Sequence, residues 1–233
     1  MKIASWSGPR NISTALMYSF AARGDVTVQD EPFYAPYLAL TRIDHPLRAE
    51  ILAGHETDPR KVVARFGGHS PHLYLKLMAQ HMVEGIDTAW ARDFSHLHLV
   101  RHPARVIASY AAKRESPTLE DLGYPRQLEI FETFGGIVVL SSDLRRRPEP
   151  TLRAICDRLG LTFTRRMLCW PKGGHSADGV WAGHWYRGVH ASTTFAGEEP
   201  EAVPELQGAA ANVCLDAMAY YEALAAHRLI VPE

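Results

Sequence analysis

An arginine and two hydroxyl side chains lie close together near the start of the chain. The stretch "SGPRNIST" places Arg10, Ser13 and Thr14 between an apolar, β-prone run and a run of helix-forming residues. The N–H groups and the dipole at the start of a helix attract anions, and a guanidinium adds a permanent positive charge. The pattern predicts a strand, a tight loop and a helix that together bind an anionic group. An ordinary turn with a serine cap is the alternative.

The loop differs from one that binds a nucleoside triphosphate. Gly8 permits a close backbone approach and Asn11 tolerates a left-handed conformation. Aligning Gly8 with the first glycine of G-x-x-x-x-G-K-[ST], however, puts Ser13, Thr14 and Ala15 where Gly, Lys and Ser/Thr belong. The phosphate-bridging lysine and the Mg²⁺-binding hydroxyl are both missing there, and γ-phosphoryl transfer depends heavily on that metal. We therefore expect a less highly charged group and no metal.

A second cluster of the same kind occurs in "LHLVRHPARVIASY". Arg101 ends a strand-like run, Pro103 stands in the first turn of a predicted helix, and Ser109 follows eight residues after Arg101. On that helix Ser109 is expected to face the same side as Arg101 and to share one anion with it. Taken alone, the pair also fits a solvated turn and a surface serine.

Short apolar runs that alternate with helical runs must position these clusters. The expected strands are 2–7, 26–29, 72–77, 96–101 and 137–140, and the expected helices include 11–22, 36–43 and 150–159. This rhythm predicts a three-layer α/β/α fold with a central parallel sheet, whose ligands bind beyond the carboxyl ends of the strands. We expect one domain over 1–233, with an irregular Trp- and His-rich segment 165–205 over the active face and a C-terminal helix 207–228.

Composition limits the classes of partner. The chain has 233 residues and a formal net charge of -1, which argues against broad nucleic-acid binding. We find no apolar run of about 20 residues and no secretory signal, so no membrane contact is expected. Three cysteines without metal-ligand spacing indicate reduced thiols in the cytoplasm. The oligomeric state is left open by the sequence.

The order of these motifs resembles that of the sulfotransferases. The resemblance implies the P-loop NTPase-like fold and 3'-phosphoadenosine 5'-phosphosulfate as co-substrate. It implies that the first loop binds the 5'-phosphosulfate and that Arg101 and Ser109 bind the 3'-phosphate. Ile12 stands where the family usually has glycine, and the family's C-terminal Arg-Lys-Gly segment is represented by Lys172 and Gly173. The expected nucleotide-binding residues of the first loop are Gly8, Pro9, Arg10, Asn11, Ile12, Ser13 and Thr14.

Sulfuryl transfer needs a group that removes the acceptor proton, and two residues are candidates for this base. Glu31 follows the second predicted strand and so lies next to the first loop. His81 follows Lys76, which ends the strand "LYLK". The family uses a glutamate or a histidine, and both stay open here. Arg10 is expected to stabilise the leaving phosphate, and Lys76 to reach the bridging oxygen.

The Trp- and His-rich segment is expected to contribute to the acceptor pocket. Its candidate residues are His184, Trp185, Tyr186 and His190, which alternatively pin a long loop to the core. The aromatic side chains favour an apolar or aromatic small-molecule acceptor over a glycan.

Three hypotheses follow. The first is a sulfotransferase that acts on a hydroxyl or amine of a small molecule. The second is a small-molecule kinase or nucleotide hydrolase on a P-loop fold. The third is a non-catalytic nucleotide-binding protein.

Overall fold

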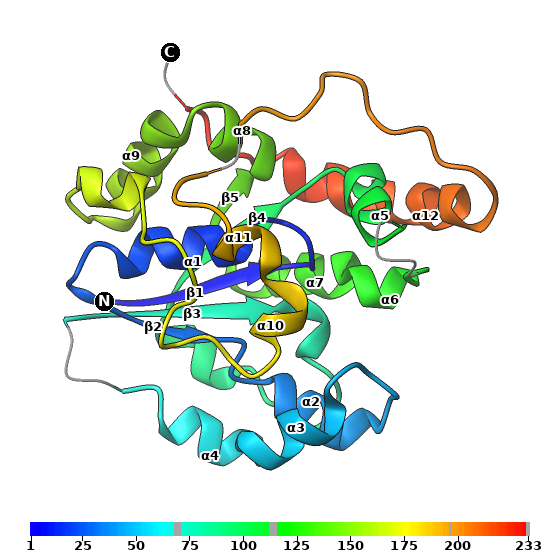
Figure 1. Ribbon diagram of the computed structural model, residues 1–233, viewed down its shortest axis with the longest axis horizontal. Coiled ribbons are helices and arrows are strands. Elements are labelled where there is room, and N and C mark those ends of the chain that lie inside the picture. Colours follow the sequence, from blue (N-terminus) through cyan, green and yellow to red (C-terminus); the bar gives the residue numbers. More distant parts are fainter. Residues whose placement is uncertain (68–70, 112–115, 196, 232–233) are drawn as a thin grey trace.

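The computed structural model describes residues 1–67, 71–111, 116–195 and 197–231 (Figure 1). Its strands are β1 (Lys2–Ser7), β2 (Val26–Asp30), β3 (His72–Met78), β4 (Ser95–Val100) and β5 (Ile137–Leu140). Its α-helices are α1 (Ser13–Ala21), α2 (Tyr34–Thr41), α3 (Arg48–Gly54), α4 (Pro59–Ala64), α5 (Pro103–Ala111), α6 (Leu119–Leu122), α7 (Tyr124–Phe134), α8 (Ser141–Arg146), α9 (Pro148–Leu159), α10 (Ala182–Trp185), α11 (Arg187–His190) and α12 (Gly208–Ala225). Its 3₁₀ turns are η1 (Ala79–His81), η2 (Ala89–Asp93) and η3 (Arg165–Leu168).

The described strands form one five-stranded sheet in the order β2-β3-β1-β4-β5. Every pairing in it is parallel, and β1 lies at the centre with Ser7 opposite Met78 of β3 and Leu99 of β4. Helices cover both faces, which confirms the predicted three-layer α/β/α fold with a central parallel sheet. Because the strands run the same way, their carboxyl ends meet along one edge.

Each face of the sheet has its own apolar core. Leu16 of α1, Leu99 of β4 and Leu152 of α9 pack on one face, and Trp6 of β1 and Val62 of α4 pack on the other. Figure 1 accordingly shows α8 and α9 on one side of the sheet and α4 on the other. Side chains of a strand point alternately to its two faces, so a strand buried on both sides consists almost wholly of apolar residues. This is the origin of the short apolar runs in the sequence.

The segment 165–205 contains more helix than its composition indicates. It includes η3, α10 and α11, and in Figure 1 α10 and α11 cross in front of the sheet. The structure places α12 within the range of the expected C-terminal helix, and α12 packs beside α5 and α7. In the described residues, no helix combines the length and hydropathy that crossing a bilayer requires.

Candidate functional site

A cavity of about 410 Å³ lies at the carboxyl edge of the sheet. The loops after β1, β2, β3 and β4 all open onto it, as expected for a parallel sheet. Its charged lining residues are Arg10, Glu31, Lys76, Arg101, Asp121 and Arg145. Its aromatic lining residues are Tyr34, Tyr37, His45, His81, Tyr110, Trp185, Tyr186 and Phe195.

Gly8 begins the loop between β1 and α1 because no larger residue fits there. A Cβ added at Gly8 would lie 2.2 Å from the backbone oxygen of Leu122, at the end of α6. Such an approach is far inside van der Waals contact, so a side chain here would move the loop or α6. The sequence suggested a close backbone approach at Gly8, and the structure identifies the carbonyl that approaches.

Two non-glycine residues shape the loop through left-handed backbone conformations. Arg10 has φ 61° and Ile12, immediately before α1, has φ 60°. This region costs an L-residue about 1–2 kcal/mol, and more for a β-branched side chain. Ile12 therefore keeps the backbone geometry that the glycine common in sulfotransferases adopts easily. The strain is of the kind that accumulates at functional sites.

Hydrogen bonds from distant residues fix the loop in this shape. The Asn11 side chain donates to the Leu99 carbonyl at 3.2 Å, and the Ser141 hydroxyl donates to the Asn11 carbonyl at 2.9 Å. Ser13 and Thr14 begin α1, are buried and line the cavity. Their hydroxyls have no hydrogen bond to another described residue. The loop thus presents the start of a helix to the cavity, and anion binding there stays a prediction.

Arg101 and Ser109 line the same cavity but hold different partners. Ser109 accepts a 2.8 Å hydrogen bond from Nε of Arg10. Arg101 donates through Nη1 to the Arg10 carbonyl at 2.7 Å and through Nε to the Glu199 carboxylate at 2.8 Å. The two predicted anion-binding clusters are therefore joined into one positively charged wall.

Glu199 is surrounded by three arginines. Its Oε1 lies 2.5 Å from Nη2 of Arg101 and 3.6 Å from Nη1 of Arg145, and its Oε2 lies 3.2 Å from Nε of Arg105. Only 7% of the Glu199 side chain is exposed. Burial lowers the pKa of Arg145, and the positive charges of Arg101 and Arg105 lower it further against the opposing effect of Glu199. An arginine cluster of this density matches a multiply charged anion.

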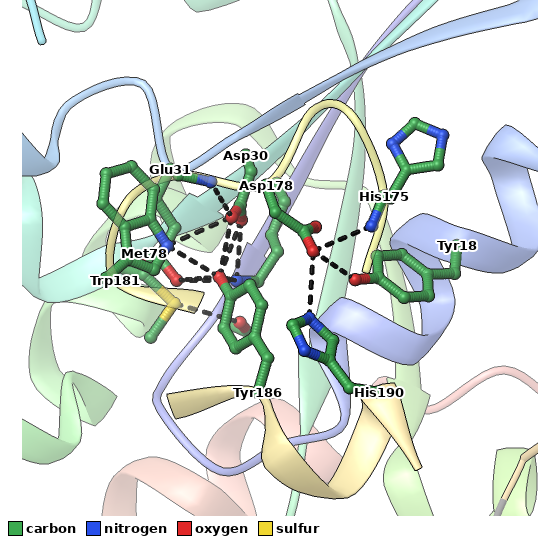
Figure 2. Close-up of polar contacts among 12 residues, drawn as sticks. Tyr18, Asp30, Glu31, Met78, His175, Asp178, Trp181, Tyr186 and His190 are labelled. Carbon is green, nitrogen blue, oxygen red and sulfur yellow. Dashed lines mark hydrogen bonds and ion pairs between the residues drawn. The ribbon is translucent and has the colours of Figure 1, made fainter. Parts of the chain in front are cut away.

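A buried ion cluster contributes Glu31, Lys76 and Tyr186 to the cavity lining (Figure 2). The ammonium of Lys76 donates to Oδ1 of Asp30 at 2.9 Å, to Oε1 of Glu31 at 2.6 Å and to the hydroxyl of Tyr186 at 2.5 Å. The three protons of the ammonium are matched by three acceptors. Trp181 completes the cluster by donating from Nε1 to Asp30 at 3.1 Å and to Tyr186 at 2.9 Å.

The two carboxylates of this cluster differ in their access to the cavity. Burial raises the pKa of Asp30, and Glu31 raises it further although Lys76 acts in the opposite direction. Burial opposes the charge on Lys76, but Asp30 and Glu31 together outweigh burial and raise its pKa. Asp30 is absent from the cavity lining, whereas Glu31 and Lys76 both belong to it. Lys76 therefore holds Glu31 in place, and its position at the cavity leaves its expected contact with the bridging oxygen a prediction.

The backbone of Glu31 is itself strained. Glu31 has φ 42° although a proline follows it, and its N–H donates to the Lys76 carbonyl at 2.9 Å. A residue before proline normally adopts an extended conformation with negative φ. The conformation aims the carboxylate at the cavity from the end of β2, where the sequence placed a candidate base.

His81, the other candidate base, lies in an aromatic stack. Its ring lies between those of Tyr34 and Tyr37, with centroids 4.6 and 4.7 Å away. Burial lowers the pKa of His81 well below its usual range, and the charges of His45 and Lys76 lower it further. Its buried Nδ1 has no hydrogen-bond partner among the described residues. The neutral imidazole is therefore the stable form, and it is a weak proton acceptor.

The carboxylate of Asp178 anchors the segment that carries α10 and α11 (Figure 2). Oδ2 of Asp178 accepts from the Tyr18 hydroxyl at 2.5 Å, from the His175 backbone N–H at 2.9 Å and from Nε2 of His190 at 3.0 Å. Burial and the hydrogen bond to Asp178 raise the pKa of Tyr18. Since Tyr18 belongs to α1, this network ties the segment to the helix that starts at the anion loop.

Of the four residues expected at the acceptor pocket, two line the cavity and two do not. Trp185 and Tyr186 line the cavity, and the Tyr186 hydroxyl also belongs to the ion cluster. His184 and His190 are not among the lining residues. His184 packs on Trp185, and His190 bonds Asp178, so the structure corrects both expectations.

Lys172 and Gly173 are also absent from the cavity lining. The Gly173 N–H donates instead to the His190 carbonyl at 2.9 Å, at the end of α11. The expectation that this pair binds the nucleotide is therefore not supported by its position. The two residues help to close the segment onto itself.

Several site residues were missed by the sequence analysis. Asp30 precedes Glu31 at a strand end, so its position was a usable signal. Glu199 and Asp178 lie in an aperiodic segment, where sequence spacing indicates no partner. The aromatic residues Tyr34, Tyr37 and His45 follow β2 in the stretch "FYAPYLALTRIDH", whose apolar residues predict a helix without indicating a binding site. The described residues hold no group of His, Cys, Asp or Glu side chains arranged for a metal ion.

Comparison with known proteins identifies the family. A family model described as "Sulfotransferase domain" matches residues 1–228. The chain belongs to the sulfotransferase domain family. The match covers the anion loop, the ion cluster and the three-arginine cluster together, which is consistent with their convergence on one cavity.

Solved sulfotransferase domains share this fold. The sulfotransferase domain from the Synechococcus PCC 7002 olefin synthase superposes with a TM-score of 0.55 at 19% identity, over 97% of this chain and 94% of that one. The sulfotransferase domain from the curacin biosynthetic pathway gives a TM-score of 0.52 at 14% identity, over 93% and 96% of the two chains. At such identities the likeness concerns the fold.

Two curated relatives from Arabidopsis thaliana have names of another kind. Branched-chain-amino-acid aminotransferase-like proteins 1 and 2 are 37% and 34% identical to this sulfotransferase domain, over 83% and 87% of the chain. The chain spans only 36% and 37% of their lengths. Their names therefore describe longer proteins, of which this domain resembles about a third.

Proposed function

We propose that the protein transfers a sulfuryl group from 3'-phosphoadenosine 5'-phosphosulfate to a hydroxyl or amine of a small molecule. The observation that carries the proposal is the convergence of an anion loop, a cluster of arginines and an oriented carboxylate on one cavity. Family membership supports the reaction class. The residue roles below are inferred from the geometry.

The donor would bind along the positive wall of the cavity. The loop from Gly8 to Thr14, with the start of α1, suits the 5'-phosphosulfate, and Arg101 suits the 3'-phosphate. Arg10 lies between them, bonded to Ser109. As the S–O bond to the 5'-phosphate breaks, negative charge develops on that phosphate, and Arg10 and the helix start are placed to stabilise it.

Glu31 is the better candidate for the base. Its carboxylate would accept the proton of the acceptor O–H or N–H while the acceptor atom forms its bond to sulfur and the 5'-phosphate leaves. The ion pair with Lys76 at 2.6 Å fixes the orientation of the carboxylate, and the strained backbone directs it into the cavity. His81 is disfavoured because its depressed pKa leaves little driving force for proton transfer.

The acceptor would bind on the aromatic side of the cavity. Tyr34, His81 and Tyr37 form a continuous stack there, and His45 and Trp185 extend it. Flat aromatic or apolar molecules bury well against such a surface. With Cys156, Cys169 and Cys214 all unpaired, we propose a reducing compartment such as the cytoplasm.

Ligand-induced thermal stabilisation tests the donor assignment. Adenosine 3',5'-bisphosphate should raise the melting temperature without Mg²⁺, whereas Mg-ATP should have little effect. Stabilisation by Mg-ATP alone would favour a kinase or nucleotide hydrolase. Transfer of ³⁵S from labelled donor to a panel of phenols, alcohols and amines then tests catalysis. Binding of the bisphosphate without transfer to any acceptor would favour a non-catalytic binding protein.

A further inference from the structure

The Glu199 carboxylate pairs with three arginines, of which Arg101 and Arg145 line the cavity, whereas Glu199 and Arg105 lie behind that lining. Each guanidinium nitrogen of Arg101 has an acceptor within the chain: Nη1 bonds the Arg10 carbonyl, and both Nε and Nη2 contact Oε1 of Glu199. Another anion can take the forked face of Arg101 only if Glu199 leaves it. Glu199 and an incoming phosphate therefore compete for the same donors.

The charges of the cluster do not balance. Arg101, Arg105 and Arg145 are all less than one-fifth exposed and carry three positive charges, while Glu199 contributes one negative charge. Partly buried like charges repel each other at short range. A phosphate monoester carries close to two negative charges at neutral pH and offers three acceptor oxygens, so it complements the cluster better than a carboxylate.

The backbone around Glu199 is held by the same arginines. Nη2 of Arg105 donates to the Pro200 carbonyl at 2.6 Å, and Nε of Arg145 donates to the Gly197 carbonyl at 3.0 Å. The arginines thus hold the short segment 197–202 by neutral carbonyl contacts as well as by ion pairs. Exchanging Glu199 for a phosphate would release the side chain and loosen this segment.

We propose that Arg101, Arg105 and Arg145 form one phosphate-monoester site whose internal ligand is Glu199, and that the 3'-phosphate of the donor nucleotide binds by displacing the Glu199 carboxylate. The proposal rests on the proposed function for the identity of the nucleotide. It adds Arg105 and Arg145 to the donor site and makes Glu199 a built-in competitor. The affinity for a 3'-phosphorylated nucleotide is thereby lower than the arginines alone would give.

Isothermal titration of Glu199→Gln tests this competition. If Glu199 holds the arginines in most molecules, only the remaining molecules can bind the 3'-phosphate, and the apparent dissociation constant is raised accordingly. Removing the carboxylate should therefore lower the dissociation constant for adenosine 3',5'-bisphosphate by about five-fold or more. Adenosine 5'-monophosphate lacks the 3'-phosphate, and its affinity should be unchanged. Glu198→Gln is the matched control, since it removes the same charge from an exposed neighbour and should alter neither affinity.

Hydrogen exchange on the unmutated chain gives an independent measurement. Adding adenosine 3',5'-bisphosphate should speed amide exchange in residues 197–202, whereas adenosine 5'-monophosphate should not. This measurement stands even if Glu199→Gln fails to fold.

The possible results separate the two proposals. If both nucleotides bind but Glu199→Gln binds the bisphosphate equally or more weakly, Glu199 orients the arginines, and the competition is overturned while the donor assignment stands. Unchanged or slower exchange in 197–202 on adding the bisphosphate likewise overturns it. If neither nucleotide binds the parent chain or the variant, the donor assignment and the competition both fail.

Discussion

The ammonium of Lys76 lies 2.6 Å from the Glu31 carboxylate and 2.9 Å from the Asp30 carboxylate. One buried cation therefore serves two adjacent carboxylates at the end of β2. Asp30 is enclosed by Lys76, Tyr186 and Trp181, whereas Glu31 also meets the cavity. The arrangement separates a carboxylate enclosed by the protein from one that lines the cavity.

Replacing Glu31 by Gln should lower sulfuryl-transfer turnover by about 10²–10⁴-fold, the usual contribution of a general base. The amide keeps the size of the side chain but accepts a proton poorly. The affinity for adenosine 3',5'-bisphosphate should change little, because the nucleotide wall is formed by other residues. Single-turnover rates and titration calorimetry measure the two effects.

Glu84→Gln serves as the control for this substitution, because Glu84 is exposed and lies away from the cavity lining. His81→Gln provides the contrast. If His81→Gln lowers turnover by the larger factor and Glu31→Gln retains most of the turnover, His81 and not Glu31 is the base.

Replacing Lys76 by Met should destabilise the protein by about 3–5 kcal/mol, because it leaves a buried carboxylate without its counter-ion. Both the Lys76 and the Asp30 side chains are at most 2% exposed. Urea denaturation measures the change in the free energy of unfolding. The double variant Lys76→Met/Asp30→Asn should recover part of the loss, and a strictly additive double variant would show that the two charges are not coupled.

Replacing Gly8 by Ala should reduce both stability and nucleotide binding. The added Cβ meets the Leu122 carbonyl at 2.2 Å, and relieving such overlap typically costs about 1–3 kcal/mol. Gly183→Ala in α10 is the matched control, since a Cβ there meets no described atom within 4 Å. Melting temperatures with and without adenosine 3',5'-bisphosphate compare the two. Equal effects at Gly8 and Gly183 would contradict the close approach described for the loop.

Stability should fall as the solution is acidified, partly because of His98. Burial lowers the pKa of His98 from 6.5 to about 3, although its hydrogen bond to the Gly135 carbonyl opposes the shift. The unfolded chain therefore binds a proton below pH 6.5 that the folded chain does not bind until about pH 3. The stabilisation present above pH 6.5 is lost across this window at up to about 1.4 kcal/mol per pH unit.

Comparison with His98→Gln isolates this contribution. The Gln amide can donate to Gly135 as Nε2 does, but it does not titrate. His81 and His96 have pKa values lowered by burial and act in the same direction, whereas the raised pKa of Asp30 acts in the opposite one. The unfolding free energy of the variant should depend less steeply on pH between 6.5 and 4.5. Parallel profiles for parent and variant would show that His98 titrates normally in the folded chain.

The sheet and the anion loop were predictable from the sequence because their signals are local. A buried parallel strand is a short apolar run, and the strand 137–140 was expected with the bounds that β5 has. The loop was predictable because arginine, hydroxyl groups and a helix start stand within seven residues of Gly8. Lys76 and Glu31 were candidates for a similar reason. Glu31 follows β2, and Lys76 ended the predicted run "LYLK", although the structure extends β3 to Met78.

The other features of the site depend on contacts between residues far apart in the sequence, and the spacing of residues along the chain does not indicate such contacts. Glu199 pairs with Arg101 across 98 positions, and Tyr186 reaches Asp30 across 156. His190 was expected at the acceptor pocket, but the distant Asp178–Tyr18 pair holds it elsewhere. The short helices α3 and α4 lack a long periodic pattern, so their sequences resemble loops.

The supports of the anion loop also set the order in which the chain can assemble. Gly8 meets Leu122, and Asn11 is held by Leu99 and Ser141. The loop is translated before these partners, because Leu99 and Ser141 follow Asn11 by 88 and 130 positions. Contacts so far apart in sequence are slow to form. The backbone shape of the loop therefore depends on partners that the chain supplies much later, and we expect the loop to reach this shape only after β4 and α8 have formed.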